Sequence, residues 1–434
     1  MSQLITNMAI HVGEVTLEEV QHQLLSDYQK VRAETEDLAL PLSPEDMQLQ
    51  SMPDASPTKW HLAHTSWFFE TFILANRLRG YQTFNPHFNH LFNSYYNSLG
   101  TPFARPNRGL ISRPDSAQVY EYRKFIDDSM HRMLSEYPIP ENLAALVQLG
   151  LNHEQQHQEL ILTDIKHALS TNPMAPAYRD MFPEDEDGAL EPLRWLSIPK
   201  DLYGIGSDGD AFCFDNEGPE HQQFIDDFVI ASRLVTNGEY LEFIEDGGYE
   251  QHRLWLSDGW LHLQKNQQKH PSYWRLNSDG WHQYSLYGLL PLNPAEPVCH
   301  LSFYEADAFA TWAGKRLPTE FEWEAAACHL RQPNQMASAN FLEKRHFRPL
   351  QAQRGQTQFL GDLWEWTSSA YLPYRGFRAR EDAVGEYNGK FMCNQKVLRG
   401  GSFATPADHI RISYRNFFYP HQSWQFTGIR LAGD

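Results

Sequence analysis

The 434-residue sequence has few cysteines, no long hydrophobic run and a deficit of positive charge. None of its four cysteines has CxxC spacing, which argues against a thiolate zinc site or a disulfide framework and favours a reducing, cytoplasmic location: Cys213, Cys299, Cys328 and Cys393. No apolar run approaches the roughly 20 residues that span a bilayer, and the N-terminus lacks a secretory pattern, so we expect no membrane segment. The formal net charge is −19. Without a basic stripe to offset it, we expect no nucleic-acid partner.

Hydrophobic residues (41%) and aromatic residues (13%) are abundant enough for packed cores, and the length predicts two domains. Apolar residues recur at three- and four-residue spacing in 15–39, 59–78, 115–134 and 139–169, which predicts four amphipathic helices, the first capped by Thr16. Such helices form a bundle whose interior can hold a metal. The long connection over 80–114 is too aromatic to be disordered, so we expect it to be functional.

The residue pattern changes after a proline- and acid-rich segment, from long helical periodicity to short aromatic runs. We place a bundle domain at 1–175, a linker at 176–192 and a second domain at 193–434. In the second domain, short aromatic runs are broken by Gly, Asp, Asn and Pro, and the clearest helical segments are 236–246, with Thr236 as N-cap, and 303–327. The predicted fold class is therefore α+β, with a helical bundle followed by a loop-rich domain.

Two histidines in GLNHEQQHQELIL have the spacing of metal ligands. His153 and His157 lie four apart and differ by about 40° around a helix, so they share a face. Gln156 faces the same side, whereas Glu159 is about 200° from His157, which makes it a group behind the ligands or a surface residue.

A third ligand must come from another segment. His64 and His61, in KWHLAHTSWFFE, are three apart and compete for this role, and His87 and His90 in the long connection remain possible by spacing. Three neutral imidazoles without a carboxylate suit either a zinc-bound water or Fe(II) with dioxygen. Spacing alone does not choose between these metals.

Several motifs together resemble one enzyme family. KWHLAH, HEQQHQE, GDLWEWTSSAYLPYRGF, LRGGSFAT, RNFFYP and FTGIRLA are similar, in order and spacing, to the ergothioneine-biosynthesis sulfoxide synthases, the EgtB-like family. The resemblance implies a DinB-like four-helix bundle followed by a domain like the formylglycine-generating enzyme, which is related to C-type lectin folds. It also implies an Fe(II) site made by His64, His153 and His157. The family joins a sulfur donor to C2 of the hercynine imidazole, using O2 and giving a sulfoxide.

The resemblance also implies roles for residues outside the metal site. Gln156, Asn416 and Tyr374 match positions that hold hercynine. A tyrosine near the metal supplies a proton or hydrogen atom, and two sites compete for it. The Tyr95–Tyr96 pair in the long connection is favoured over Tyr371.

The sulfur donor is the least constrained substrate. The branch of the family with a tyrosine pair tends to use free cysteine, and the other branch uses γ-glutamylcysteine. Arg105 and Arg108, in ARPNRG, could bind a donor carboxylate bidentately or be solvated loop residues. A related selenoneine synthase would use a selenosugar donor instead.

The second domain lacks one feature of the enzyme that it resembles. RNFFYPHQSWQFTGIRLAGD has no cysteine, which argues against oxidation of a protein cysteine by the route of that enzyme, and we expect the domain to build one wall of a small-molecule pocket. It could also hold structural Ca²⁺ on loop carbonyls. A histidine-specific enzyme of the OvoA type is disfavoured, because the chain has no room for a methyltransferase domain. From another class, a DinB-type metal-dependent thiol transferase or a non-catalytic ligand-binding protein remains an alternative.

Overall fold

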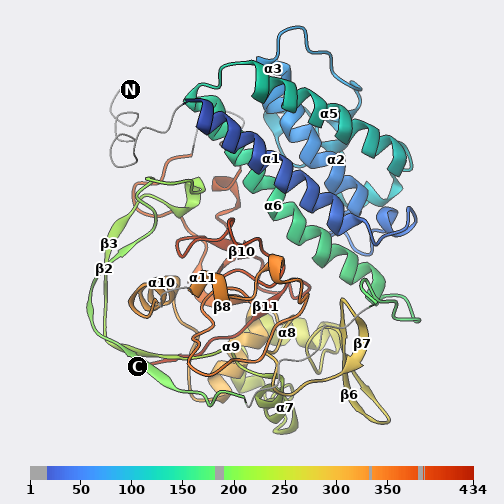
Figure 1. The fold of residues 1–434 in the computed structure, drawn as a ribbon. Coiled ribbons are helices and arrows are strands. Elements are labelled where there is room, and N and C mark those ends of the chain that lie inside the picture. The colour runs from blue at the N-terminus through green and yellow to red at the C-terminus, as the bar shows by residue number, and fades with distance from the viewer. Residues whose placement is uncertain (1–16, 181–189, 332–334, 380–384, 386) are drawn as a thin grey trace. The chain divides into compact units, whose positions relative to one another are not determined.

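The computed structural model describes residues 17–180, 190–331, 335–379, 385 and 387–434 (Figure 1). The chain forms two compact units, the first built mainly from residues up to Thr171 and the second from most of the residues after it. In the described residues, no helix has the length and apolar composition needed to span a membrane.

In the described residues, the core of the first unit is a bundle of four α-helices, which run side by side in Figure 1. They are α1 (Leu17–Ala39), α2 (Thr58–Phe68), α5 (Ser116–Glu136) and α6 (Glu141–Ser170). The four predicted helices are therefore confirmed, although Thr16, the predicted cap of the first, lies outside the described residues. The second predicted helix, 59–78, is α-helical only as far as Phe68. A π-helical turn, η2 (Phe69–Leu74), follows and leads into α3 (Ala75–Arg77).

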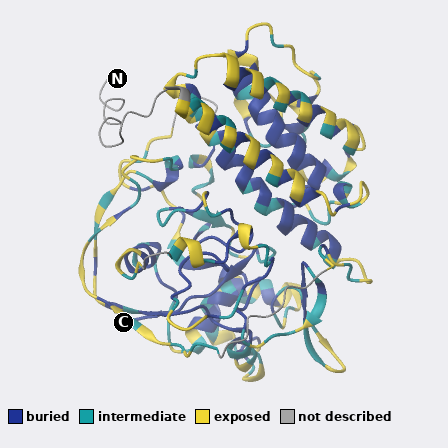
Figure 2. Cartoon of the chain, viewed as in Figure 1, coloured by how far each residue is buried: buried dark blue, intermediate teal, exposed yellow. Residues whose placement is uncertain are grey.

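The helix α2 lies at the centre of the bundle. All eleven of its residues are buried, whereas α1 alternates buried and exposed positions (Figure 2). The π-helical turn packs closely against α6, where a Cβ atom on Gly150 would lie 2.7 Å from the Phe69 ring. Glycine at this position allows the two segments to approach one turn before His153.

A buried ion-pair network links three of the bundle helices. Glu154 on α6 accepts hydrogen bonds from Arg32 on α1 (3.0 Å) and Arg123 on α5 (2.7 Å), and all three side chains are buried. The two guanidinium groups hold the pKa of the Glu154 carboxyl below its usual value in spite of burial. Because Glu154 directly follows His153, this network holds α6 in place at His153.

The long connection between α3 and α5 folds against the bundle. It contains α4 (Phe88–Phe92) and two 3₁₀ turns, η3 (Asn97–Leu99) and η4 (Arg105–Leu110), and another such turn, η1 (Asp46–Gln48), precedes α2. Buried Glu70 accepts hydrogen bonds from the Tyr81 hydroxyl (2.7 Å), the Phe84 N–H (3.0 Å) and the Tyr122 hydroxyl, which holds the start of the connection in place.

In the residues that the structure describes, the second unit contains four small sheets. One has the order β1 (Trp195–Ile198), β4 (Phe228–Ala231), β12 (Ala432–Gly433). A second has the order β10 (Asn416–Phe418), β9 (Lys396–Arg399), β8 (Trp364–Ala370), β11 (Thr427–Gly428), in which only β11 and β8 are parallel. The others are the β2 (Asp201–Ile205)–β3 (His221–Ile225) ribbon and the meander β5 (Trp274–Asn277), β6 (Gly280–Ser285), β7 (Gly288–Pro291).

Within the described ranges, five α-helices accompany these sheets: α7 (Asn237–Glu245), α8 (Ser257–Asn266), α9 (Phe303–Trp312), α10 (Glu320–His329) and α11 (Gln335–Ser338). Thr236 caps α7 as predicted. The predicted segment 303–327 is two helices, because Gly314 has a φ of +64° and Thr319 begins a new capping box. The predicted α+β fold class is confirmed.

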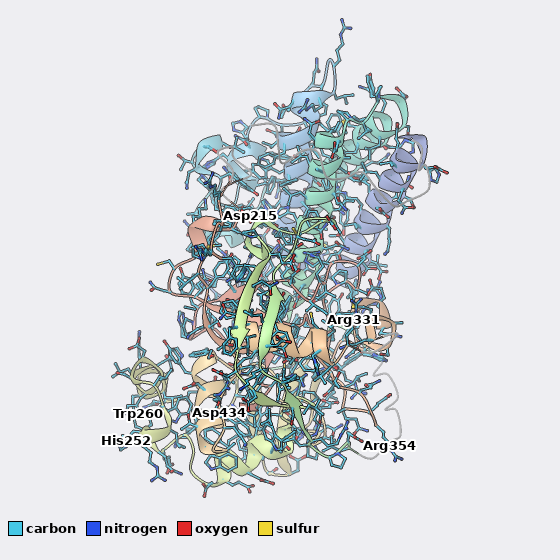
Figure 3. The ribbon with its side chains drawn as sticks, turned by 90° about the vertical axis from the view of Figure 1, so that its left-hand side faces the viewer. Asp215, His252, Trp260, Arg331, Arg354 and Asp434 are labelled. Carbon is cyan, nitrogen blue, oxygen red and sulfur yellow. The ribbon has the colours of Figure 1, made fainter. Side chains whose placement is uncertain are left out.

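Charged side chains brace the interior and the edge of the second unit. Arg430 binds both carboxylate oxygens of Glu365 (2.7 and 2.8 Å), and Trp323 donates to the same carboxylate. At the C-terminal strand, Arg316 donates to the Asp434 carboxylate (2.9 Å; Asp434 is labelled in Figure 3). These pairs join distant segments of a unit that has little regular secondary structure.

Candidate metal centre

Three histidines from two helices of the first unit converge. His64 on α2 and His153 and His157 on α6 each offer one nitrogen, and these nitrogens all lie within 4.8 Å of one another. The Nε2 atoms of His64 and His153 are 3.1 Å apart. All three side chains are buried. In the described part of the chain, this is the one cluster of three or more His, Cys, Asp or Glu side chains with metal-binding geometry.

The outward-facing nitrogens of two of these rings are held by other groups. His64 Nδ1 lies 2.6 Å from the Phe92 carbonyl oxygen on α4. His157 Nδ1 lies 2.8 Å from His61 Nδ1. With Nδ1 occupied in this way, Nε2 is the nitrogen that each neutral imidazole has left for a metal.

His61, the competing candidate for the third ligand, lies behind the cluster. Its Nδ1 faces His157, and its Nε2 is 3.0 Å from the Asp164 carboxylate on α6. His87 and His90, the other candidates, are exposed, and His90 Nδ1 binds the Thr101 carbonyl oxygen (2.7 Å).

The three imidazoles of the cluster are held in the neutral form, which can bind a metal cation. Burial lowers the pKa of the His153 imidazole to about 3, and burial together with the neighbouring imidazoles lowers the pKa values of His64 and His157 well below the usual range. The imidazoles are thus neutral at physiological pH, which is the form that binds a metal. A set of three neutral imidazoles without a carboxylate fits zinc, iron, copper or nickel.

Aromatic side chains enclose the cluster. Trp60 and Trp67 stack on the His64 ring with centroid distances of 4.6 and 5.5 Å, and Phe68 lies 4.8 Å from the His153 ring. The indole N–H of Trp60 donates to the Leu91 carbonyl (3.0 Å). Leu91 and Phe92 of α4 thus accept hydrogen bonds from Trp60 and His64, so α4 holds the His64 side of the cluster in place.

The predicted tyrosine pair follows α4 directly. Tyr95 and Tyr96 stack with a centroid distance of 4.7 Å, and the buried Tyr96 ring packs against Trp67 at 5.7 Å. The Asn93 side chain fixes this turn, since its Oδ1 accepts from the Tyr96 N–H and its Nδ2 donates to the Tyr96 carbonyl, both at 2.9 Å. One tryptophan ring therefore separates Tyr96 from a histidine of the cluster.

The two predicted arginines differ in their environment. Arg108 is buried, with its guanidinium carbon 3.4 Å from the centre of the Trp60 ring and its Nη1 donating to the Ser56 hydroxyl (2.9 Å). Burial and nearby Arg105 lower the pKa of Arg108. Arg105 is exposed and donates to the Asp54 carbonyl. Only Arg108 lies beside the cluster.

The remaining predicted residues lie on α6 and in the second unit. Gln156 and Glu159 are both half-buried. Tyr371 is buried, its ring stacks on Phe417 (4.2 Å), and its hydroxyl accepts from Asn216 (2.8 Å).

Tyr374 and Asn416 have polar partners within that unit. The Tyr374 hydroxyl donates to Glu320 (3.0 Å) and accepts from Arg399 (2.9 Å). Asn416 begins β10, and its Oδ1 accepts from the Phe417 N–H (2.9 Å). A structural Ca²⁺ on loop carbonyls stays a prediction.

Sequence reasoning missed the supports of the cluster, which include Asp164, Asn93 and Trp60. Asp164 was detectable, because it follows His157 by seven residues and thus lies on the same face of α6 two turns later. Trp60 precedes His64 by four residues and Asn93 precedes Tyr96 by three, so these two contacts are local. The contacts of Trp60 with Leu91 and of Tyr96 with Trp67 join segments that are distant in sequence, and no local spacing reveals them.

Comparison with known proteins extends over both units. Residues 195–434 match the family of sulfatase-modifying factor enzyme 1-like domains, and residues 27–161 match the DinB superfamily. The hercynine oxygenase of Mycolicibacterium smegmatis is 31% identical over 90% of this chain and 94% of its own length. That of Mycobacterium tuberculosis is 30% identical, with coverages of 88% and 92%. Ergothioneine biosynthesis protein 1 of Schizosaccharomyces pombe is 29% identical over 51% of this chain and 27% of its own length. The predicted order, a DinB-like bundle before a domain like the formylglycine-generating enzyme, is confirmed.

Proposed function

Because the chain belongs to the EgtB-like hercynine oxygenase family, we propose that it is an Fe(II)- and O2-dependent sulfoxide synthase of ergothioneine biosynthesis. It would form a C–S bond between a thiol donor and C2 of the hercynine imidazole. The observation that carries this proposal is the buried cluster of neutral His64, His153 and His157, whose nitrogens converge within 4.8 Å. Bound Fe(II) would supply the redox chemistry with O2 and would favour the thiolate form of the donor.

Arg108 is the proposed contact for the donor carboxylate. Its guanidinium is buried, and within the described residues its Nε has no hydrogen-bond partner and no carboxylate pairs with it. A buried cation of this kind gains most from a bidentate carboxylate, and free cysteine would place one a short distance from its sulfur. γ-Glutamylcysteine carries the same carboxylate, so we favour free cysteine because the Tyr95–Tyr96 pair resembles the branch of the family that tends to use it, with exposed Arg105 as a second contact.

Tyr95 and Tyr96 are the proposed source of the proton. The Tyr96 ring contacts Trp67, which stacks on His64, and Asn93 holds the turn on both sides of Tyr96. A hydroxyl must lie close to the reacting atoms to transfer a proton. We keep the pair ahead of Tyr371, whose hydroxyl is bound to Asn216 in the second unit.

Hercynine is proposed to contact Gln156, which follows His153 on α6 and is half-buried. Asn416 and Tyr374 would contact the substrate from the second domain. The Tyr374 hydroxyl already forms hydrogen bonds with Glu320 and Arg399. Tyr374 would therefore contact hercynine with its aromatic ring and would not donate a hydrogen bond to it.

The test is a reconstitution with Fe(II), O2, hercynine and one donor at a time: cysteine, γ-glutamylcysteine or a selenosugar. We expect oxygen uptake and a C–S linked sulfoxide by mass spectrometry, with cysteine as the best donor. The selenosugar as best donor would make the enzyme a selenoneine synthase. Iron-loaded protein that consumes no O2 with any donor would refute the proposal and favour a thiol transferase or a non-catalytic binding protein.

A matched pair of variants tests the donor contact. Arg108→Leu should raise KM for cysteine by about 10-fold or more, in keeping with loss of a charge-assisted hydrogen-bonded pair. Arg105→Leu should raise it less, because this side chain is exposed. Equal effects on KM for cysteine and for hercynine would contradict an assignment to the donor.

A further inference from the structure

A continuous chain of buried groups extends from the metal cluster into the bundle. His157 Nδ1 lies 2.8 Å from His61 Nδ1, and His61 Nε2 lies 3.0 Å from Asp164 Oδ2. The same Asp164 oxygen accepts the Ser56 backbone N–H at 2.8 Å. Only 8% of His157, 2% of His61 and 5% of Asp164 is exposed, so water does not compete for these hydrogen bonds.

The chain of hydrogen bonds has one consistent direction when His157 acts as a ligand. A neutral imidazole that uses Nε2 for a metal carries its proton on Nδ1. His157 Nδ1–H must then donate to His61 Nδ1, so the His61 proton lies on Nε2 and is donated to the Asp164 carboxylate. Every polar hydrogen in the chain has an acceptor in this arrangement, and the reverse direction would leave the carboxylate without a proton donor from His61.

The same geometry excludes His61 as a ligand. One of its nitrogens faces His157 and the other faces Asp164, so neither is directed to the centre where His64 and His153 meet.

We propose that His61 and Asp164 are a positioning pair for His157, which fix its tautomer and ring orientation and make it a stronger electron donor to the metal. The inference rests on the metal site proposed above. Groups that accept the second N–H of a metal-bound histidine typically contribute 10- to 100-fold to metal affinity.

The pair makes the cluster asymmetric. His64 has a backbone carbonyl as its acceptor, that of Phe92, whereas His157 is linked to the side-chain carboxylate of Asp164 through a second imidazole. Charge-assisted hydrogen bonds are the stronger kind. His157 is therefore the ligand whose donor strength depends most on groups outside the cluster.

The experiment measures Co²⁺ affinity by competition with a chromophoric chelator, together with the visible absorption bands of the bound Co²⁺. The variants are His61→Leu, His61→Gln, Asp164→Ala and Asp164→Asn. We expect His61→Leu and Asp164→Ala to raise the Kd 10- to 100-fold and to shift the Co²⁺ bands. His61→Gln should recover part of the loss, because its Oε1 can accept from His157 Nδ1–H, and Asp164→Asn should lose less than Asp164→Ala.

His167→Leu is the matched control, since His167 lies one turn after Asp164 on α6 and its Nδ1 contacts the Ser51 hydroxyl at 2.6 Å. It should bind Co²⁺ as tightly as the wild type. Metal-free circular dichroism of each variant excludes misfolding as the cause, and the two conservative variants keep the test available if His61→Leu does not fold.

Two results would overturn the pairing. His61→Leu with wild-type affinity and wild-type Co²⁺ bands would show that the pair does not act on His157. Loss of binding as complete as in His157→Ala, without recovery in His61→Gln, would make His61 itself a ligand. Failure of the wild-type protein to bind Co²⁺ would instead refute the metal site on which the inference rests.

Discussion

Acidification should destabilise the metal-free bundle, and His153 allows the size of the effect to be calculated. Its pKa is lowered to about 3 in the folded chain, against about 6.5 in an unfolded one. Between these values the unfolded state binds a proton that the folded state does not, so stability falls as the pH falls below the unfolded value. From pH 7.5 to pH 5.0, His153 alone should cost about 2 kcal/mol.

His64 and His157 shift in the same direction and add to the loss. Two carboxyl groups of the second unit respond in the opposite sense, because burial raises the pKa of Glu305 to about 7 and that of Asp362 to about 6. Protonation of these carboxyl groups favours its folded state as the pH falls. A measurement on the whole chain would therefore mix opposing effects.

Hydrogen exchange resolved by peptide avoids this mixture. We expect the opening free energy of peptides from α2 and α6 in metal-free protein to fall between pH 7.5 and 5.0, after correction for intrinsic exchange rates. In His153→Leu, the fall should be smaller by about 2 kcal/mol, because one titrating group is removed. The same fall in wild type and variant would refute the claim that burial keeps His153 neutral.

Three substitutions test other parts of the structure. Gly150→Val should lower the free energy of unfolding by about 1–3 kcal/mol in chemical denaturation, because its Cβ would lie 2.7 Å from a phenylalanine ring, whereas unchanged stability would refute that close contact. Glu154→Ala should cost about 3–5 kcal/mol by the same assay, since two buried arginines each lose one of their two carboxylate partners, and a cost below 1 kcal/mol would contradict a tight network. Asn93→Ala should increase hydrogen exchange around Tyr96 at least several-fold without changing exchange in α6, because two hydrogen bonds to its backbone are lost; equal exchange would show that the turn is held otherwise.

The spacing of apolar residues predicted the elements whose position depends only on residues within the same helix. Apolar residues recur at helical spacing in all four bundle helices, so their positions followed from that spacing, although α2 is buried on every side. The π-helical turn after Phe68 did not, because one wider turn leaves the apolar pattern nearly unchanged. In the second unit, the parallel pairing of β11 with β8 joins segments more than sixty residues apart, and such pairing has no local signature.

The candidate site could be predicted only in part for the same reason. The four-residue spacing of His153 and His157 places both on one face, and the structure brings His64 to them. His61 and His64 have equal standing by spacing, and their different surroundings come from Asp164 and Phe92 on other segments. Which histidine faces the centre depends on those tertiary contacts.

The stacking of tryptophans on His64 gives the protein an intrinsic optical reporter. Trp60 lies one turn before His64 on α2 and Trp67 one turn after it, with ring distances of 4.6 and 5.5 Å, and they are two of the twelve tryptophans in the chain. Indole emission is quenched by paramagnetic ions at such short range. Occupancy of the histidine cluster can thus be followed by fluorescence without a label, and substitution of Trp60 and Trp67 by phenylalanine identifies the part of the signal that belongs to the site.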